Sequence, residues 1–268
     1  MTKSKTTRIR HSSRLLTIPS KPREITIPVM VHMDFKLTKK LAKENGFKTR
    51  KKIKGIVHNI LKDANELFRR PSLNQTIILK LIDTKFYRNT NAVTMSENGN
   101  NYLRSYCERQ SHKKILKKRL YYSILLTGLD LFYIKNGKAV RASTARSYSN
   151  GICSTKKSCA LIEWQSKNME YLVAHEIGHS LGIPHDGYPF NNCEGSKGIM
   201  VPRYNSSKLP EFWSPCSRVS FEYFLSLGFS ILINGTHETQ SFQIFGALYL
   251  RMVEHGNANL LLLIDKAL

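Results

Sequence analysis

The 268-residue sequence is poor in acidic residues and has no long apolar run. It has 19 Asp and Glu against 42 Lys and Arg, a formal net charge of +23, which favours polyanions such as sulfated glycans, acidic lipid headgroups or nucleic acid. It lacks the paired-cysteine fingers and aromatic-laced strands of base-reading modules. We therefore interpret the charge as solvated surface first, and expect no specific nucleic-acid partner.

The sequence also lacks a recognisable export signal. Residues 1–24 are polar and basic and have no apolar centre of the kind that a signal peptide requires. The apolar runs at 229–233, 244–250 and 260–264 are each far below the roughly 18 residues of a membrane span. We expect residues 1–24 to be a basic stub, either a prodomain remnant or a disordered segment, and we expect no transmembrane segment.

The apolar pattern predicts a mixed fold. Ile25–Phe35 has strand composition, although Pro28 restricts it to a sheet edge or to a late start. From Ile53 to Phe68 apolar residues recur every three or four positions, as on one face of a helix. Ile77–Ile82 and Ser123–Leu126 are short apolar runs of the length of buried strands.

A polar segment separates the last two runs. Residues 96–110 place Leu103 and Cys107 on one helical face, and the basic cluster Lys113–Arg119 follows; we expect this cluster to face solvent. The alternation of strands and helices predicts an α/β sandwich with a mostly parallel sheet.

The strongest functional signal is a run of histidines around one glutamate. His175 and His179 lie four positions apart, so on a helix their imidazoles project from one face and can bind one metal ion. Gly182 and Pro184 end such a helix, and the turn returns His185 as a third ligand. Three neutral imidazoles leave a fourth tetrahedral position for water, as in catalytic zinc sites.

Glu176 follows the first histidine directly. Its carboxylate therefore lies near the open position of the metal, where it can accept a proton from bound water. This pattern predicts hydrolysis by zinc-activated water, with Glu176 as general base and then as the acid that protonates the departing amine. Chance is the alternative explanation, and we assign it a probability below about 2%.

With these residues the sequence resembles the metzincin metallopeptidases, whose H-E-x-x-H-x-x-G-x-x-H motif precedes a Met-containing turn. Gly198–Pro202 matches that turn, and the resemblance implies that Met200 forms a hydrophobic floor beneath the zinc. Asp186, directly after the third histidine, is typical of the adamalysin or reprolysin branch, which includes venom metalloproteinases and disintegrin-type proteases with thrombospondin motifs.

The resemblance covers about residues 25–227. It implies a metzincin-type catalytic domain over this range, with a mostly parallel twisted sheet, long helices, the zinc-binding helix and the Met-turn, followed by a divergent tail of uncertain fold at 228–268. Gly151–Ala160 resembles the edge strand and loop that line the cleft and bind an extended peptide by strand addition.

Five cysteines leave at least one without an intramolecular partner. The resemblance implies that Cys107 pairs with Cys159 and Cys193 with Cys216. Cys153 stays unpaired, because the cysteine expected beyond the final helix of the domain is missing.

The resemblance further implies one catalytic Zn²⁺ and structural calcium sites in the relatives. Here Tyr122 and Ser123 stand where relatives have acidic ligands, and only Asp34 and Asp130 survive. Because hard cations need several oxygen ligands together, we do not expect structural calcium.

The function that follows is a secreted zinc metalloendopeptidase acting on extracellular or host proteins. Because no signal or long prodomain is visible, we expect a fragment of a longer secreted protease, and a minimal cytosolic protein is the alternative. The competing function is a catalytically inactive protease-fold protein that binds polyanions or protein partners. The intact zinc ligands and Glu176 weigh against it.

Overall fold

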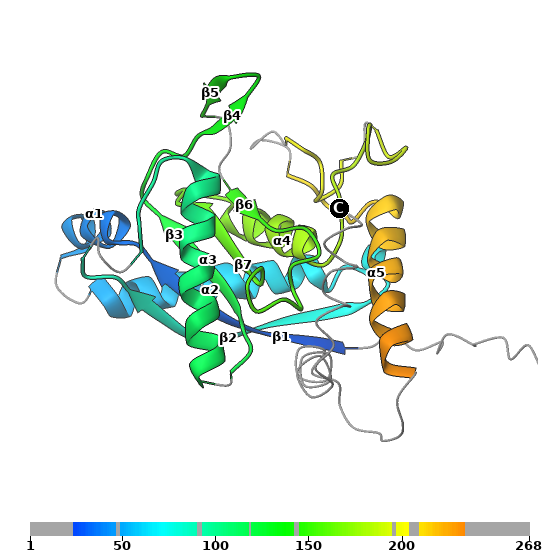
Figure 1. The fold of residues 1–268 in the computed structure, drawn as a ribbon, viewed down its shortest axis with the longest axis horizontal. Coiled ribbons are helices and arrows are strands. Elements are labelled where there is room, and N and C mark those ends of the chain that lie inside the picture. The colour runs from blue at the N-terminus through cyan, green and yellow to red at the C-terminus, as the bar shows by residue number, and fades with distance from the viewer. Residues whose placement is uncertain are drawn as a thin grey trace, which may run out of the picture.

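The computed structural model describes residues 24–46, 49–89, 93–117, 119–141, 145–194, 197–203 and 209–233. The predictions for a basic stub and for most of the tail therefore lie outside the described residues. A five-stranded sheet in the order β2-β1-β3-β7-β6 forms the centre of the molecule (Figure 1). Its strands are β1 (Glu24–Met33), β2 (Thr76–Phe86), β3 (Tyr122–Thr127), β6 (Ala145–Ser147) and β7 (Cys159–Glu163).

The sheet is mostly parallel, which confirms the predicted α/β class. β1, β2, β3 and β7 run parallel, and β6 alone is antiparallel, against β7. A separate hairpin of β4 (Tyr133–Lys135) and β5 (Lys138–Val140) projects beside the sheet (Figure 1). The other elements are α1 (Phe35–Asn45), α2 (Thr49–Phe68), the short 3-10 helix η1 (Pro71–Leu73), α3 (Gly99–Lys117), α4 (Met169–Ser180) and α5 (Pro215–Ile233).

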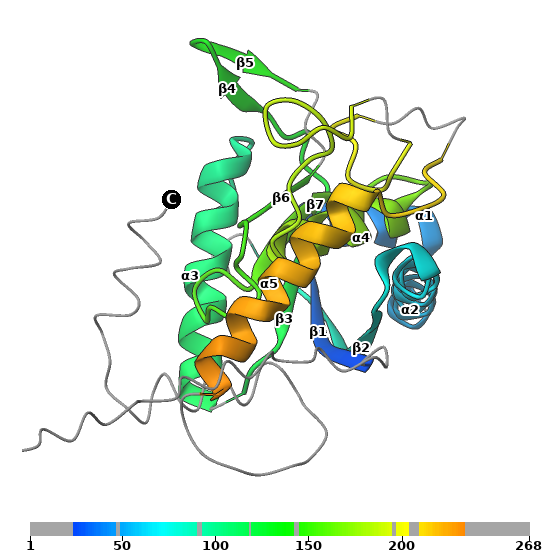
Figure 2. The ribbon, with the colours of Figure 1, turned by 90° about the vertical axis from the view of Figure 1, so that its right-hand side faces the viewer.

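Helices cover both faces of the sheet, and the strand alternation explains how. In β3, Leu125 packs with residues of α3 on one face, whereas Ile124 and Leu126 pack with residues of α2 and α4 on the other. Figure 2 shows α3 and α2 on opposite sides of the strands. β3 is buried along its whole length, as expected for a strand covered on both faces. None of the described helices is long and apolar enough to cross a membrane.

The first strand differs in part from its prediction. β1 is an internal strand between β2 and β3, not an edge strand. Pro28 is tolerated because it lies opposite Lys80 of β2 in a stretch that has no partner on its other side: β3 pairs with β1 only from Val29 onward. Proline has no amide hydrogen to donate to a neighbouring strand. It is therefore tolerated in the first half of β1, where only β2 pairs with the strand. The strand nevertheless begins at Glu24, before Pro28, so both predicted alternatives, an edge strand and a late start, were wrong.

The basic cluster at 113–119 is not wholly solvent-facing, contrary to the prediction. Lys114 is only 1% exposed. Its Nζ donates to the carbonyl oxygen of Ser158 at 2.9 Å and to the Ser158 hydroxyl at 2.6 Å, and it lies 5.2 Å from the centre of the Tyr121 ring. No carboxylate pairs with it within the described ranges. Burial therefore lowers the pKa of Lys114 to about 7.

This buried amine makes stability depend on pH. Between about pH 7 and the usual lysine pKa of 10.5 the unfolded chain binds a proton that the folded chain releases, so the free energy of unfolding rises with pH. We expect a rise on the order of 2 kcal/mol from pH 7 to 9.5. Lys114→Met should flatten this rise in urea unfolding, whereas Lys117→Met, at an exposed position of the same helix, should leave it unchanged. Identical slopes in both variants would contradict the account.

Candidate metal centre

The helix α4 carries the first two histidines and is buried between the sheet and α2. It ends where the sequence predicts. Gly182 has a φ of 82°, a left-handed conformation that glycine adopts without strain. The amide of Ile183 donates back to the Gly178 carbonyl oxygen at 3.0 Å. This turn redirects the chain so that His185 returns toward the helix.

The imidazole rings of the three histidines lie close together. The ring nitrogens of His175, His179 and His185 all lie within 4.8 Å of one another. The Nε2 atom of His185 is 3.2 Å from Nε2 of His175 and 3.1 Å from Nε2 of His179. Four-coordinate zinc with bonds of 2.0–2.1 Å holds its ligand nitrogens roughly 3.3 Å apart. The spacing therefore matches a tetrahedral zinc site.

The tautomers also fit a metal ion. Nδ1 of His175 lies 2.8 Å from the Ile199 carbonyl oxygen, and Nδ1 of His179 lies 2.9 Å from that of Ile183. A carbonyl oxygen only accepts, so each Nδ1 carries the hydrogen and each Nε2 presents a lone pair. These lone pairs converge on the centre of the triad. A cation at this point satisfies them, and the triad thus fits a Zn²⁺ ion.

Burial keeps these histidines neutral. It lowers the pKa of His175 to about 4 and that of His179 to about 3, and it lowers the pKa of His185 as well. Neighbouring imidazoles lower the first two values further. Because only neutral imidazole binds a metal, all three rings are in the ligating form at neutral pH without deprotonation by the ion.

The Glu176 carboxyl lies on the same helix and is only 5% exposed. Burial raises the pKa of Glu176 to about 7, against the opposing effects of the Ser147 hydrogen bond and the Arg146 charge. The Ser147 hydroxyl lies 2.6 Å from Glu176 Oε2 and 3.0 Å from its carbonyl oxygen. Ser147 therefore fixes one carboxylate oxygen of Glu176 from the neighbouring strand β6.

Sequence reasoning missed Ser147. Its hydrogen bond spans 29 positions and joins a three-residue strand to the helix, and no local pattern marks the strand.

The structure also corrects the position of the edge strand. Gly151–Ser158 is a chain of turns and Cys159–Glu163 is an inner strand, whereas β6 (Ala145–Ser147) forms the edge on this side of the sheet. Three residues are too few for alternation to reveal a strand.

Met200 lies beneath α4 and is fully buried. A Cβ atom added to Gly178 would lie 2.8 Å from Met200 Sδ and 3.2 Å from Trp213 Cζ3, so both side chains pack directly on the helix backbone between the two histidines. The residue before Met200 supplies the carbonyl oxygen that accepts the His175 hydrogen bond. The turn at 198–202 therefore supports the helix and orients one ring.

Alanine substitutions at two glycines are expected to have opposite effects on the stability of the fold. Gly178→Ala introduces the clash with Met200 and should destabilise the fold by about 1–3 kcal/mol, with weaker zinc affinity. Gly55→Ala, in an exposed part of α2 with no atom within 4 Å, should stabilise it by about 0.5–1 kcal/mol. Denaturant unfolding and a zinc competition titration measure both effects. Equal stability of the two variants would contradict direct packing of Met200 on the helix.

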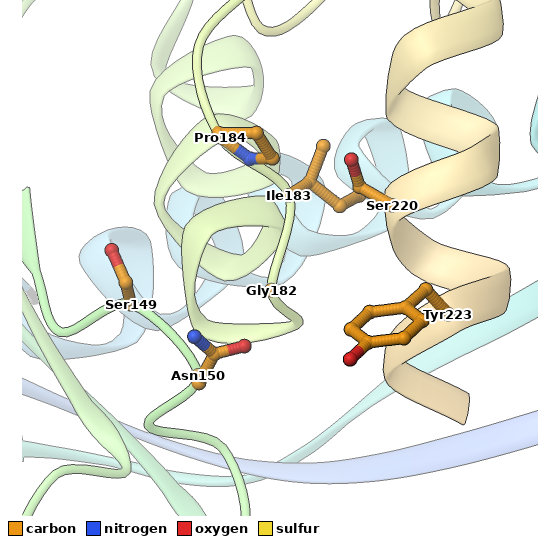
Figure 3. Close-up of a pocket in the computed structure, with 7 residues that line it drawn as sticks. All are labelled: Ser149, Asn150, Gly182, Ile183, Pro184, Ser220 and Tyr223. Carbon is orange, nitrogen blue, oxygen red and sulfur yellow. The ribbon is translucent and has the colours of Figure 1, made fainter. Parts of the chain in front are cut away.

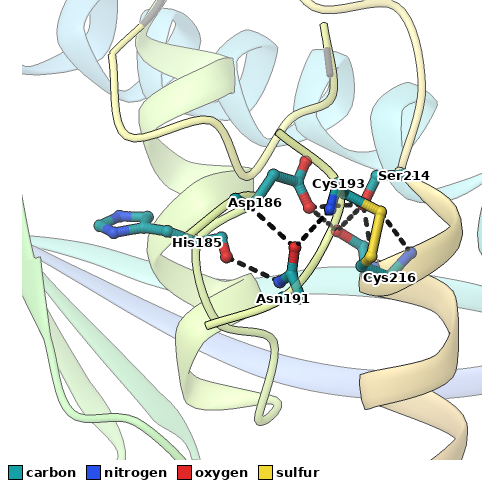
Figure 4. The surroundings of a disulfide bond; sticks show 8 residues. His185, Asp186, Asn191, Cys193, Ser214 and Cys216 are labelled. Atoms are coloured by element: carbon teal, nitrogen blue, oxygen red, sulfur yellow. Dashed lines mark hydrogen bonds between the residues drawn. A yellow bond between two sulfur atoms is a disulfide. The ribbon is translucent and has the colours of Figure 1, made fainter. Parts of the chain in front are cut away.

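Asp186 connects the metal loop to α5 (Figure 4). Its carboxylate is buried and accepts from the Ser214 hydroxyl at 2.5 Å and from Ser217 at 3.4 Å, at the start of that helix. The Asn191 amide donates to the His185 carbonyl oxygen at 2.9 Å. His185 is thus held by contacts on both sides, independently of a metal ion.

The cysteines form two disulfides, Cys107–Cys159 and Cys193–Cys216. The first joins α3 to β7, and the second joins the loop after His185 to the first turn of α5 (Figure 4). Cys153 is free, and burial raises the pKa of its thiol to about 11. Its thiol is therefore protonated at neutral pH and is a poor nucleophile.

The two surviving acidic positions have partners within the chain. Asp34 caps α1 through the Leu37 amide at 2.7 Å and accepts from the hydroxyls of Thr127 at 2.5 Å and Tyr102 at 3.1 Å. Asp130 pairs with Arg141 at 2.9 Å. The absence of structural calcium stays a prediction.

A separate cavity of about 210 Å³ lies behind the turn that ends α4. Figure 3 shows Asn150 and Tyr223 on opposite sides of the Gly182 turn. None of the three histidines lines it, so it is distinct from the metal centre. Its lining residues are Ser149, Asn150, Gly182, Ile183, Pro184, Ser220 and Tyr223.

A mostly parallel sheet, a buried helix with paired histidines and a methionine turn beneath it define the metzincin class of zinc metallopeptidases. Residues 29–231 match the family described as "Reprolysin (M12B) family zinc metalloprotease". The chain therefore belongs to the reprolysin family.

Three curated human relatives are similar to this chain. "A disintegrin and metalloproteinase with thrombospondin motifs 16" from Homo sapiens is 29% identical over 84% of this chain and 18% of its own length. The corresponding human proteins numbered 7 and 18 are 30% identical over 68% of this chain and 11% of their length, and 37% identical over 46% and 10%, respectively. The chain thus spans less than a fifth of the length of these relatives.

Proposed function

We propose that this protein is a zinc-dependent endopeptidase, with His175, His179 and His185 as the ligands of one Zn²⁺ and Glu176 as general base. The observation that carries this proposal is the clustering of three imidazoles beside a buried glutamate, Glu176, that directly follows the first histidine on the same helix. A structural zinc site has no need of a buried carboxyl beside its ligands. Membership of the reprolysin family supports peptide or protein substrates.

The residues around Glu176 suit proton transfer. Ser147 occupies Oε2, which leaves Oε1 to accept a proton from the attacking water. After it has accepted this proton, the same carboxyl can protonate the leaving amine. Bound Zn²⁺ supplies the Lewis acidity that lowers the pKa of this water and stabilises negative charge on the carbonyl oxygen. In this proposal Met200 forms the hydrophobic floor beneath the zinc.

The substrate binds as an added strand along β6. This strand is one of the two edges of the sheet, and the Ser147 hydroxyl on it contacts Glu176. An extended peptide can add to the edge strand of a sheet, which would place one of its peptide bonds opposite the metal centre. We therefore propose cleavage within extended segments of protein chains.

The two disulfides support a secreted, extracellular protein, because such bonds persist in oxidising compartments. We propose that the substrates are extracellular or host proteins. We also propose residues 25–227 as the catalytic domain, with α5 continuing to Ile233.

Cleavage-site profiling tests this function. The purified protein is incubated with a denatured proteome, with and without a zinc-selective chelator, and new termini are identified by mass spectrometry. We expect internal cuts that disappear with the chelator and return when zinc is restored. Zinc-loaded protein without any internal cut would refute the proposal and favour the inactive, partner-binding alternative.

A further inference from the structure

A basic hollow of about 290 Å³ lies where the start of α2 meets the end of β2. Its volume is close to the lower limit of small-molecule sites, roughly 300 Å³. None of its residues belongs to the metal centre. Four cationic side chains and one carboxylate surround it, so its net charge is positive. The lining residues are Arg50, Lys54, Asp83, Thr84, Lys85, Phe86 and Arg88.

The single carboxylate of the basic hollow is already neutralised. Asp83 is 2.8 Å from Lys54 Nζ and 2.5 Å from Lys85 Nζ, and these two contacts hold the pKa of Asp83 well below its usual range. Each ammonium group keeps further hydrogens to donate. Arg50 and Arg88 form no ion pair with the carboxylates of the described residues. The hollow therefore has excess donors and excess positive charge.

A β-bulge turns the end of β2 toward this hollow. Val29 of β1 lies opposite Leu81 and Met30 lies opposite Asp83, so Ile82 is the extra residue. Before the bulge the odd-numbered residues Ile77 and Leu79 are buried, whereas after it Thr84 is buried. Bulges at sheet edges commonly re-aim side chains near functional sites.

Thr84 supplies an independent sign of a ligand. It is 3% exposed, lines the hollow, and its hydroxyl has no hydrogen-bond partner within the described part of the chain. A buried hydroxyl without a protein partner is left to pair with a water molecule or with a bound group. A hydroxyl beside guanidinium and ammonium groups is complementary to an oxyanion.

We propose that the basic hollow binds a sulfate group of a sulfated glycan, with Arg50 and Arg88 as the main charged contacts and Thr84 as an additional donor. The two disulfides favour a glycan over nucleic acid, because sulfated glycans are the abundant polyanions of oxidising, extracellular surroundings. Phe86 is the one aromatic side chain of the hollow, and a single ring does not provide the series of stacking platforms on which successive bases of a nucleic acid bind.

Binding of a sulfated glycosaminoglycan hexasaccharide to the full chain tests this site. Arg50→Gln with Arg88→Gln removes two charges and leaves both lysine contacts of Asp83 intact. We expect a rise in Kd of tenfold or more at 0.1 M salt, and a salt dependence reduced by about two released ions. Lys138→Gln with Lys156→Gln removes the same charge at exposed positions outside the hollow, and should change Kd less than twofold.

The Thr84→Val variant distinguishes binding in the hollow from binding through general surface charge. This substitution keeps the side-chain shape and removes only the hydroxyl, so we expect a weaker Kd with an unchanged salt dependence. Equal effects of the two double variants, or an unchanged Kd in Thr84→Val, would overturn the proposal. Tighter binding of a single-stranded DNA oligonucleotide than of the hexasaccharide, or binding of the desulfated hexasaccharide with equal affinity, would also overturn it. Zinc content and peptide cleavage should be unchanged in all variants.

Discussion

Glu176→Gln is expected to lower kcat/KM for peptide cleavage by about 10²–10⁴-fold while zinc stays bound. The amide keeps the size of the side chain and a hydrogen bond to Ser147, but it accepts no proton from water. A loss of this size corresponds to roughly 3–5 kcal/mol of transition-state stabilisation. The measurement is steady-state cleavage of a fluorogenic peptide, with metal analysis of the same sample.

Glu170→Gln is the matched control, because it makes the same chemical change in the first turn of the same helix. We expect activity within about twofold of the unchanged protein. Wild-type activity in Glu176→Gln would exclude this carboxyl as general base. Loss of zinc from that variant would instead assign it a role in metal binding.

Trp213→Ala is expected to destabilise the fold by about 3–5 kcal/mol. The indole is 1% exposed, stacks on Phe68 with ring centres 5.1 Å apart, and donates from Nε1 to the Leu67 carbonyl oxygen at 2.8 Å. It also contacts Gly178 of the histidine-bearing helix. Its removal therefore leaves a large cavity between α2 and α4.

Urea unfolding followed by circular dichroism measures this loss. The other tryptophan, Trp164, is only partly buried, so Trp164→Ala should cost less than half as much. Trp213→Phe keeps the stacking and removes the hydrogen bond, with an expected loss of about 1–2 kcal/mol. A Trp213→Ala protein as stable as Trp164→Ala would show that the indole does not carry this packing.

The parts of the site that were predictable from the sequence are those set by local geometry. His175 and His179 share a helix face because of their spacing, and Gly182 ends that helix because of its conformational freedom. The α2 helix was predictable for the same reason, since its apolar period is local. Short-range rules were sufficient wherever the residues that decide the structure are near one another in the chain.

The remaining features depend on contacts between distant residues. Lys114 is buried because Ser158, 44 positions later, accepts its hydrogen bonds. The Ser147 contact with Glu176 exists only because the sheet brings a three-residue strand beside the helix. The unpaired Thr84 hydroxyl depends on a bulge in the β2 register. Such pairings cannot be predicted from composition or periodicity.

Zinc reconstitution tests the central claim most directly. The protein is stripped of metal, titrated with zinc, and assayed for bound metal and peptide cleavage at each step. We expect cleavage to be absent from the stripped protein and to rise linearly to a plateau at one equivalent of bound zinc, with neither binding nor cleavage in His175→Gln with His179→Gln. Full cleavage by the stripped protein, or unchanged zinc binding in the double variant, would contradict the assignment of this histidine triad as the catalytic metal centre.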